Sequence, residues 1–185
     1  IGVTGWSGSG KTTLLLKVIP LLRAQGLRVA TVKHAHHDFD VDQPGKDSYE
    51  HRKAGANEVL VASARRFALM HELRDEAEWT LAALLQKLSP VDLVIVEGFK
   101  TQRHAKIEVW REATRQPPIC INDPTILSVA TCDMCPVRGI PMMDLNDPAL
   151  IAELRAAFIE SAARQVDLLS RSRCDANWQY SCYRI

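Results

Sequence analysis

Short apolar runs alternate with amphipathic stretches along most of this chain, and the alternation predicts an α/β fold. Apolar runs of strand length that end in polar turns indicate strands, whereas apolar residues three and four positions apart indicate helices. We expect a mostly parallel central sheet with helices on both faces. The stretches that we assign to strands are residues 1–4, 27–33, 58–63, 66–70, 91–96, 106–111, 126–130 and 140–144.

Two of these predicted strands differ in the environment that they indicate. Residues 91–96 are nearly all apolar, which is typical of a strand that is covered on both faces. Residues 106–111 alternate between polar and apolar side chains, so we expect a more exposed strand there.

Residues 12–25 predict the first helix, because their apolar side chains recur with the helical period. Pro20 lacks a backbone donor, so we expect a kink in this helix. The face that we expect to pack on the sheet consists of Leu14, Leu15, Val18, Leu21 and Leu22.

Three further helices are predicted along the chain. A short charged helix is expected to have Asp47 or Ser48 as its cap and to extend to Ala54. An amphipathic helix is expected over residues 77–88, and a last one begins at Asp147.

The segment between the first predicted strand and the first predicted helix has the pattern G-x-x-x-x-G-K-[ST]. In this pattern, backbone N–H groups surround the phosphates of a nucleotide, and glycine permits their close approach. The phosphates also lie at a helix N-terminus, which carries a partial positive charge. We therefore predict the phosphate-binding loop of a P-loop nucleoside triphosphatase. Its predicted ligand-binding residues are Gly5, Ser7, Gly8, Ser9, Gly10, Lys11 and Thr12.

Three side chains have predicted roles in the chemistry of a bound triphosphate. Lys11 places a positive charge against the β- and γ-phosphates, and the Thr12 hydroxyl ligates Mg²⁺. Glu97 follows the apolar run 91–96 at the same edge of the sheet, where a carboxylate supports Mg²⁺ directly or through water. The alternative for Glu97 is a solvated carboxylate at a strand end.

The polar segment from His34 to Ser48 also begins where a predicted strand ends, on the edge where open α/β sheets bind ligands. Because buried unpaired charges are costly, we expect a mobile, solvent-facing loop that orders over the phosphates or against a partner. The histidines of this segment are candidate phosphate or partner donors, and Asp47 is a candidate for positioning water. These histidines are His34, His36 and His37.

A metal site is the alternative for the same segment, since imidazole and carboxylate together suit Zn²⁺ or Ni²⁺. The candidate carboxylates are Asp38, Asp40 and Asp42, but the spacing does not match a closed zinc site. Cys132 and Cys135 form one isolated C-x-x-C pair, for which ordinary thiols in a loop are the favoured interpretation.

Composition and charge narrow the class of protein further. The 185 residues have a net charge of +1, so no overall basic field favours nucleic acid or an anionic membrane. No apolar run approaches the roughly 20 residues that cross a bilayer. Five scattered cysteines fit a reducing compartment, and the cytoplasm is the expected location. The chain begins inside a predicted strand and without methionine, so we expect further residues before it.

The character of the sequence changes after about Ser161. Residues 161–185 are rich in arginine and show no clean period, which predicts a poorly ordered tail. A packed extension or a partner contact is the alternative. We expect residues 1–160 to form a single nucleotide-binding domain.

Three segments together carry a more specific signal than the phosphate-binding loop alone. They are G-W-S-G-S-G-K-T-T at 5–13, V-K-H-A-H-H-D-F-D-V-D-Q-P-G-K-D-S-Y-E-x-R-K-A-G-A at 32–56, and L-V-I-V-E-G-F-K at 93–100. In these segments the chain resembles the molybdopterin-guanine dinucleotide biosynthesis protein B (MobB) family, over roughly residues 1–161.

The resemblance implies a P-loop protein that binds GTP and Mg²⁺, has weak GTPase activity and forms a homodimer. It further implies an accessory role with the guanylyltransferase that joins GMP to molybdopterin, with molybdopterin itself a candidate ligand. The residues that it assigns to phosphates and Mg²⁺ are Gly8, Gly10, Lys11, Thr12 and Thr13, and it places Glu97 at the end of the Walker B strand.

No residue pattern in the sequence supports a preference for guanine over the other nucleobases. The chain lacks the N-K-x-D guanine signature, and residues 129–135 (V-A-T-C-D-M-C) replace a V-A-S-D-like segment of the family near the base. Two rival functions stay open. A metal-delivery chaperone would bind metal through the histidines or the two cysteines, and a small-molecule kinase would place a substrate hydroxyl beside the γ-phosphate.

Overall fold

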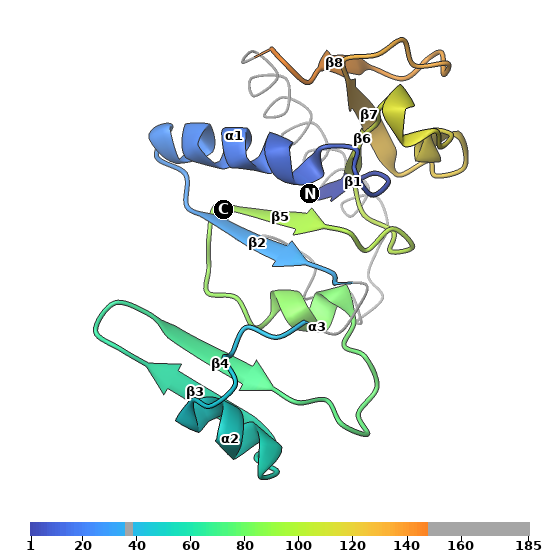
Figure 1. Cartoon of the computed structure of the whole chain (residues 1–185). Helices are drawn as coiled ribbons and strands as arrows, with labels where there is room; N and C mark the ends of the chain where they lie inside the picture. Colours follow the sequence, from blue (N-terminus) through green and yellow to red (C-terminus); the bar gives the residue numbers. More distant parts are fainter. Residues whose placement is uncertain (36–38, 148–185) are drawn as a thin grey trace, which may run out of the picture. The chain divides into compact units, whose positions relative to one another are not determined.

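The computed structural model describes residues 1–35 and 39–147, which divide into two compact units. The first unit contains Ile1–His34 and the described residues from Leu81 onward, and the second contains the described part of Ala35–Thr80. Each unit has its own sheet (Figure 1). Across the described residues, no helix has the length and apolar character needed to cross a membrane.

The first unit is built on a sheet of six strands, and each of its pairings is parallel. This confirms the predicted α/β class with a mostly parallel sheet. The spatial order is β2-β5-β1-β6-β7-β8, so β1 lies between β5 and β6. The strands are β1 (Gly2–Thr4), β2 (Val29–Lys33), β5 (Leu93–Glu97), β6 (Lys106–Val109), β7 (Ile126–Thr131) and β8 (Met142–Asp144).

Two apolar clusters cover the two faces of this sheet. On one face, α1 (Lys11–Ala24) packs Leu14, Leu15, Val18 and Leu22 against a cluster that includes Ile95. On the other, α3 (Leu81–Leu85) contributes Leu81 to a cluster with Val96 and Phe99. Ile95 and Val96 are consecutive in β5 and therefore point to opposite faces. The prediction that this strand is covered on both faces is confirmed.

Two details of the predicted helices are wrong. Leu21, which we placed on the packed face of the first helix, is 42% exposed, because the sheet covers only the narrower stripe through Leu14, Val18 and Leu22. The helix predicted over residues 77–88 is helical only at Leu81–Leu85. Its first residues belong to the second unit, so the helix starts where the chain enters the first. The helix α1 itself continues through Pro20.

The strand that we expected to be exposed, β6, is instead buried along its whole length. Its two charged residues, Lys106 and Glu108, are 1% and 0% exposed. The Lys106 ammonium donates to Gln102 O (2.6 Å), Asp123 Oδ2 (3.0 Å) and Thr125 Oγ1 (2.8 Å). The burial is tolerated because all three N–H donors of the ammonium have acceptors.

Glu108 is satisfied in a comparable way. Its carboxylate accepts the backbone N–H groups of Ile119 (2.7 Å) and Cys120 (2.9 Å), at the start of the short 3₁₀ helix η2 (Ile119–Ile121). A carboxylate at a helix start meets both unpaired N–H groups and partial positive charge. The alternating pattern of β6 therefore came from two buried charges with partners elsewhere in the chain, not from exposure.

The second unit consists of a hairpin and a short helix. The strands β3 (Glu58–Ala62) and β4 (Phe67–His71) pair antiparallel, close to their predicted positions. The helix α2 spans Asp47–Lys53 with Lys46 as its cap residue, so the predicted cap is wrong by one position. Ser48 Oγ donates to Asp42 Oδ1 (2.9 Å) and does not cap the helix.

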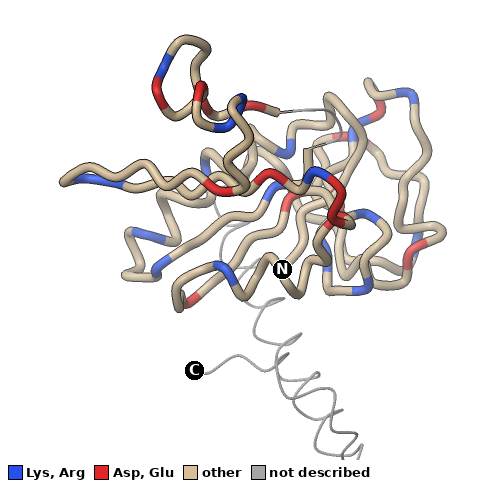
Figure 2. Tube along the Cα trace, turned by 90° about the horizontal axis from the view of Figure 1, so that it is seen from below, with Lys and Arg blue, Asp and Glu red and all other residues tan. Residues whose placement is uncertain are grey.

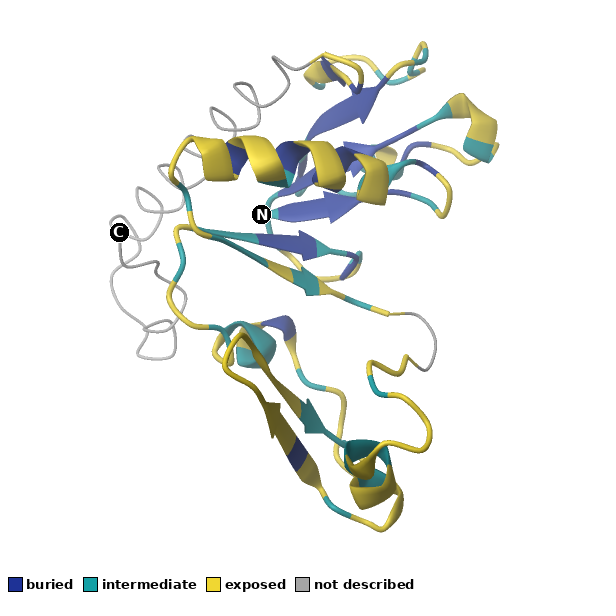
Figure 3. Ribbon diagram, turned by 60° about the vertical axis from the view of Figure 1, so that its left-hand side comes forward, coloured by how far each residue is buried: buried dark blue, intermediate teal, exposed yellow. Residues whose placement is uncertain are grey.

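Burial separates the two sheets clearly. The central strands β1, β6 and β7 of the first unit are largely buried, whereas the hairpin is mostly exposed (Figure 3). Residues of both charges are interspersed along the traces of both units (Figure 2).

Candidate nucleotide-binding site

The predicted phosphate-binding loop connects β1 to α1 at the C-terminal edge of the sheet. Its residues Gly5, Gly8 and Gly10 all have positive φ angles, which side chains other than glycine adopt only with strain. A Cβ atom on Gly5 would overlap the carbonyl oxygen of Val109 in β6. A Cβ atom on Gly8 would meet nothing within 4 Å, so the loop is open on that side.

Lys11 is the first residue of α1, and its ammonium group lies against the loop. Its Nζ donates to the carbonyl oxygens of Gly5 and Trp6, at 2.9 Å in each case. These two bonds leave the third N–H donor of the ammonium for another acceptor. Burial lowers the pKa of Lys11, and the carboxylate of Glu97 opposes this shift.

The start of α1 offers further donors. The first bond of this helix joins Leu14 N to Gly10 O (2.9 Å). The N–H groups of Lys11, Thr12 and Thr13 precede that turn and therefore have no acceptor inside the helix. Thr12 and Thr13 are exposed. Backbone donors, an ammonium group and an exposed hydroxyl together suit a triphosphate with its Mg²⁺.

Ser9 shapes the loop from inside. Its N–H donates to Trp6 O (3.2 Å), and its carbonyl oxygen accepts from Arg111 Nε (3.1 Å). Its hydroxyl is buried and, like that of Thr4, has no hydrogen-bond partner within the described part of the chain. Both backbone groups of Ser9 are thus committed to holding the loop.

Glu97 ends β5 beside the loop. Its register partner is Val3 of β1, and its side chain is 14% exposed. Its Oε1 lies 3.7 Å from Nζ of Lys33, which ends β2. Since its charge also acts on Lys11, the fold brings the two predicted residues Lys11 and Glu97 to one edge of the sheet.

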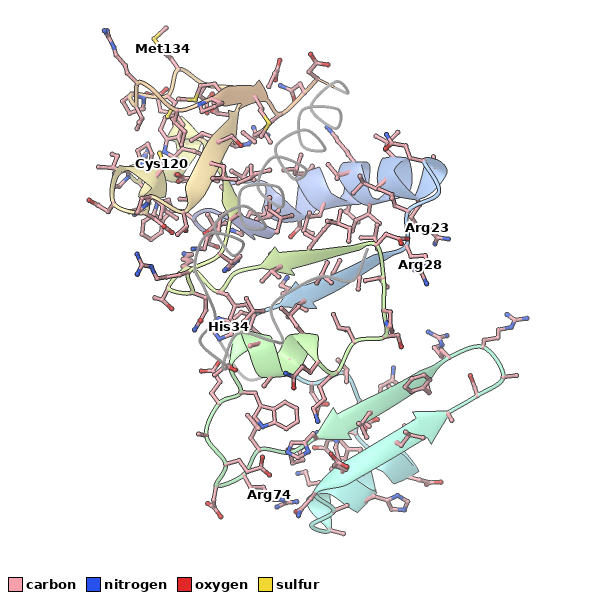
Figure 4. All side chains as sticks on the ribbon, turned by 180° about the vertical axis from the view of Figure 1, so that it is seen from behind. Arg23, Arg28, His34, Arg74, Cys120 and Met134 are labelled. Atoms are coloured by element: carbon pink, nitrogen blue, oxygen red, sulfur yellow. The ribbon has the colours of Figure 1, made fainter. Side chains whose placement is uncertain are left out.

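The turn after Glu97 explains the rest of the E-G-F-K segment. Gly98 and Phe99 both have positive φ, at 93° and 48°, and such a conformation costs a non-glycine residue roughly 1 kcal/mol. A Cβ atom on Gly98 would lie 3.0 Å from Cβ of His34. The buried Phe99 ring lies 4.8 Å from the His34 ring. Figure 4 labels His34, which follows β2. His34 thus packs on the turn that follows Glu97.

Trp6 links the loop to two other segments of the first unit. Its indole Nε1 donates to the carbonyl oxygen of Pro117 (2.8 Å). The Lys100 ammonium lies 4.6 Å from the centre of its ring, a cation–π contact worth about 0.5–1 kcal/mol at an exposed site. Trp6 thus holds the loop in place.

Arg111 is a second residue at the loop whose role is not evident from the sequence pattern. It follows β6 at the C-terminal edge, is half-buried, and bonds the carbonyl oxygen of Ser9. The next strand is tied to the same place, because Asp133 Oδ2 accepts the Glu112 N–H (2.9 Å). The edge rule that selected Glu97 after β5, applied to β6, would have found Arg111.

The remaining predicted site residues lie outside the first unit or outside the described chain. His36 and His37, with Asp38, fall outside the described residues. Asp47 begins α2 in the second unit and is exposed, so its role stays a prediction.

The aspartates of the predicted loop are engaged within the second unit. Arg52 binds Asp40 (2.8 Å), Asp42 (3.3 Å) and Glu72 (2.8 Å). The Asp42 side chain is only 9% exposed. This arginine lowers the pKa of Asp40 through their hydrogen bonds. We expected solvent-facing carboxylates, and for Asp42 that expectation is wrong because Arg52 binds it.

The described cysteines are free thiols. Cys132 is exposed, Cys135 is half-buried, and burial with the neighbouring Glu108 raises the pKa of Cys120 to about 12. Within residues 1–35 and 39–147, no three His, Cys, Asp or Glu side chains are grouped as metal ligands.

A cavity of about 400 Å³ opens beside the connection from β5 to β6. Lys100, Arg103, Lys106 and Asp123 are its charged lining residues. Because Lys100 also contacts Trp6, this cavity adjoins the segment that holds the phosphate-binding loop.

Comparison with known proteins identifies the family to which this chain is similar. The model of the family described as molybdopterin guanine dinucleotide synthesis protein B matches residues 1–132. The molybdopterin-guanine dinucleotide biosynthesis adapter protein of Escherichia coli K12 is 46% identical over 156 residues, which cover 83% of this chain and 89% of that protein. The protein of the same description from Haemophilus influenzae is 43% identical over 131 residues, covering 71% of this chain and 73% of that protein.

Solved structures give the same result for the fold. A crystal structure of molybdopterin-guanine biosynthesis protein B aligns with a TM-score of 0.63 at 30% identity. The alignment covers 85% of this chain and 97% of that one. On the phosphate-binding loop, the parallel sheet and these similarities, this chain belongs to the molybdopterin-guanine dinucleotide synthesis protein B family.

Proposed function

We propose that this protein binds GTP with Mg²⁺ and assists the guanylyltransferase that joins GMP to molybdopterin. The observation that carries the proposal is the loop between β1 and α1, where Lys11 lies beside open backbone donors and Glu97 ends the neighbouring strand. The description of its relatives as molybdopterin-guanine dinucleotide biosynthesis adapter proteins supports the second part.

In this proposal the loop binds the phosphates. The amides at the start of α1 donate to phosphate oxygens, and the third donor of the Lys11 ammonium binds the β- and γ-phosphates. Gly8 leaves room for this approach. The remaining proposed phosphate ligands are Gly5, Ser7, Gly8, Ser9, Gly10, Thr12 and Thr13.

Thr12 and Glu97 would hold the Mg²⁺ that accompanies the triphosphate, which neutralises charge on the transferring phosphoryl group. The Glu97 carboxylate is largely shielded from solvent, which strengthens its interaction with any cation beside it. The Lys33 ammonium lies 3.7 Å from this carboxylate. We propose slow hydrolysis, with Asp47 positioning water.

The partner is proposed to be the guanylyltransferase itself. His34, His36 and His37 are the proposed contacts to the phosphates or to this partner. His34 is fixed on the turn after Glu97, so a partner that contacts this turn would contact the nucleotide edge of the sheet as well. Molybdopterin is a further candidate ligand.

We also propose a homodimer, and the hairpin supports it. Leu60 pairs with Leu69 and Ala62 pairs with Phe67, so these side chains share one face. Leu60, Leu69 and Phe67 are 61%, 50% and 72% exposed. Val59 on the opposite face is buried. An exposed apolar sheet face marks a contact surface, and a second copy of the chain would cover it.

Calorimetric titration with GTP and Mg²⁺ tests the proposed site. Lys11→Ala removes one charge-assisted contact without changing the core, so GTP affinity should fall by roughly 1.5–3 kcal/mol or more. Lys17→Ala is the matched control, because Lys17 is an exposed lysine of the same helix. GTP affinity that is equal in the two variants would exclude the loop as the binding site.

A further inference from the structure

Arg111 follows β6 and contacts the phosphate-binding loop. This contact uses only part of the hydrogen-bonding capacity of its guanidinium group. Its Nε donates to Ser9 O (3.1 Å), which uses only one of the five N–H donors of a guanidinium. Within the described residues, the terminal nitrogens of Arg111 have no hydrogen-bond partner.

The guanidinium lies along the loop at Gly10. The position of a Cβ atom on Gly10 is 3.4 Å from Arg111 Nε, 3.8 Å from Nη2 and 4.0 Å from Cζ. These Arg111 atoms are the nearest neighbours of that side of Gly10. Gly10 immediately precedes the first helical residue, Lys11. The guanidinium plane of Arg111 therefore borders the proposed phosphate site at the start of α1.

The sheet order gives the two ends of a bound nucleotide different neighbours. Lys33 and Glu97 end β2 and β5, which lie on one side of β1, and Glu97 is the proposed metal support. Arg111 follows β6, on the other side of β1. If the γ-phosphate and Mg²⁺ lie on the β5 side, the nucleoside leaves the loop on the β6 side, beside Arg111.

We propose that Arg111 recognises the nucleobase and makes the site selective for guanine. This rests on the proposed nucleotide site and adds the residue that reads the base. Guanine presents two acceptors, O6 and N7, which a guanidinium binds with two parallel hydrogen bonds. Adenine has an amino group in place of O6. This group is a donor, so it cannot accept a hydrogen bond from the N–H groups of arginine.

The contact with Ser9 gives this arginine a fixed orientation. The hydrogen bond at Nε orients the planar guanidinium, so little freedom is lost when a base binds. The segment after β7 borders the same region, since the Asp133 carboxylate accepts the Glu112 N–H. Arg111 thereby supplies a guanine-selective group in a chain that lacks the N-K-x-D signature.

The test is calorimetric titration of the full chain with GTP, ATP and inorganic triphosphate, each with Mg²⁺. The wild type should prefer GTP to ATP by at least about tenfold. Arg111→Lys keeps a donor for Ser9 O but loses the planar pair, so GTP affinity should fall about tenfold to a hundredfold. ATP and inorganic triphosphate should change by less than about threefold, and Arg138→Ala, at an exposed arginine, should change nothing.

A GTP-to-ATP ratio that is unchanged in Arg111→Lys would overturn the inference, even if both nucleotides bind. Arg111→Met is the second variant, and equal losses for GTP and inorganic triphosphate in both variants would also overturn it, since Arg111 would then act on the phosphates. If the wild type binds neither GTP nor inorganic triphosphate, the proposed nucleotide site itself fails, which is a separate result.

Discussion

The first unit of this protein buries charged side chains, whereas the second unit exposes apolar ones. In the first unit, β6 buries a lysine and a glutamate completely, and both side chains are hydrogen-bonded. In the second unit, the hairpin leaves Leu60, Phe67 and Leu69 exposed. A six-stranded sheet with two apolar clusters has surroundings in which charges can be enclosed and paired. A two-stranded hairpin has no such interior, and its outer face is available to another surface.

The largest effect should come from removing one buried charge of β6. Lys106→Met removes the ammonium group that pairs with the Asp123 carboxylate and donates to two other acceptors, and should destabilise the protein by about 3–5 kcal/mol. Urea unfolding measures this loss. The double variant Lys106→Met/Asp123→Asn should lose less than the sum of its single changes, because no unpaired charge remains.

The matched control for that measurement is Lys17→Met, at an exposed position of α1. It should change the unfolding free energy by less than about 0.5 kcal/mol. If Lys106→Met were equally mild, the buried charges would not distinguish the first unit from the second.

A smaller effect is expected from His104, which precedes β6. Burial lowers its pKa to about 4, and neither ring nitrogen has a hydrogen-bond partner within the described residues. The folded protein therefore keeps this ring neutral, while the unfolded chain takes up a proton below about pH 6.5. Stability from this group is present above pH 6.5 and is lost as the pH falls toward 4.

The ring is only partly buried, so solvent reduces the effect to about 1–2 kcal/mol. Thermal unfolding of the wild type and of His104→Gln between pH 7 and pH 4 would measure it. The difference between the two proteins should change in favour of the variant as the pH falls. A constant difference would show that His104 does not titrate differently on unfolding.

The smallest effect on stability is expected from changes at the hairpin. These changes should instead alter the oligomeric state. Leu60→Glu/Leu69→Lys puts opposite charges on directly paired positions, which keeps the strand pairing favourable. Unfolding should change by less than about 1 kcal/mol, whereas light scattering should show a dimer for the wild type and a monomer for the variant.

Leu16→Lys, at an isolated exposed leucine of α1, is the control and should leave the dimer intact. If the hairpin variant keeps the molecular mass of the wild type, the exposed apolar face of the hairpin is not the dimer contact.

What the sequence could predict depended on how local the determining contacts are. The loop between β1 and α1, the buried strand that leads to Glu97 and the two strands of the hairpin were predicted at nearly their observed positions, because each is determined by neighbouring residues. The burial of Lys106 could not be predicted, since its partners Asp123 and Thr125 lie 17 and 19 residues away. The same is true of Arg111 and Ser9, which are 102 residues apart.

The roles of the site residues divide in the same way. The fold brings Lys11 and Glu97 to one edge of the sheet, as the spacing of motif and strand predicted. The aspartates after His34 were expected to face solvent because the segment has many ionisable groups. That composition could not show that Arg52 binds Asp40 and Asp42. Composition reveals that charges are present, but only the tertiary structure determines their partners.

The central claim is that nucleotide bound at the loop enables this protein to assist guanylyltransfer to molybdopterin. The most direct measurement is the rate of guanylyltransfer by the purified partner enzyme with wild-type protein, Lys11→Ala or Lys17→Ala added in equal amounts. We expect stimulation by the wild type and by Lys17→Ala, and none by Lys11→Ala. Equal stimulation by Lys11→Ala, in a preparation that no longer binds GTP, would contradict the account.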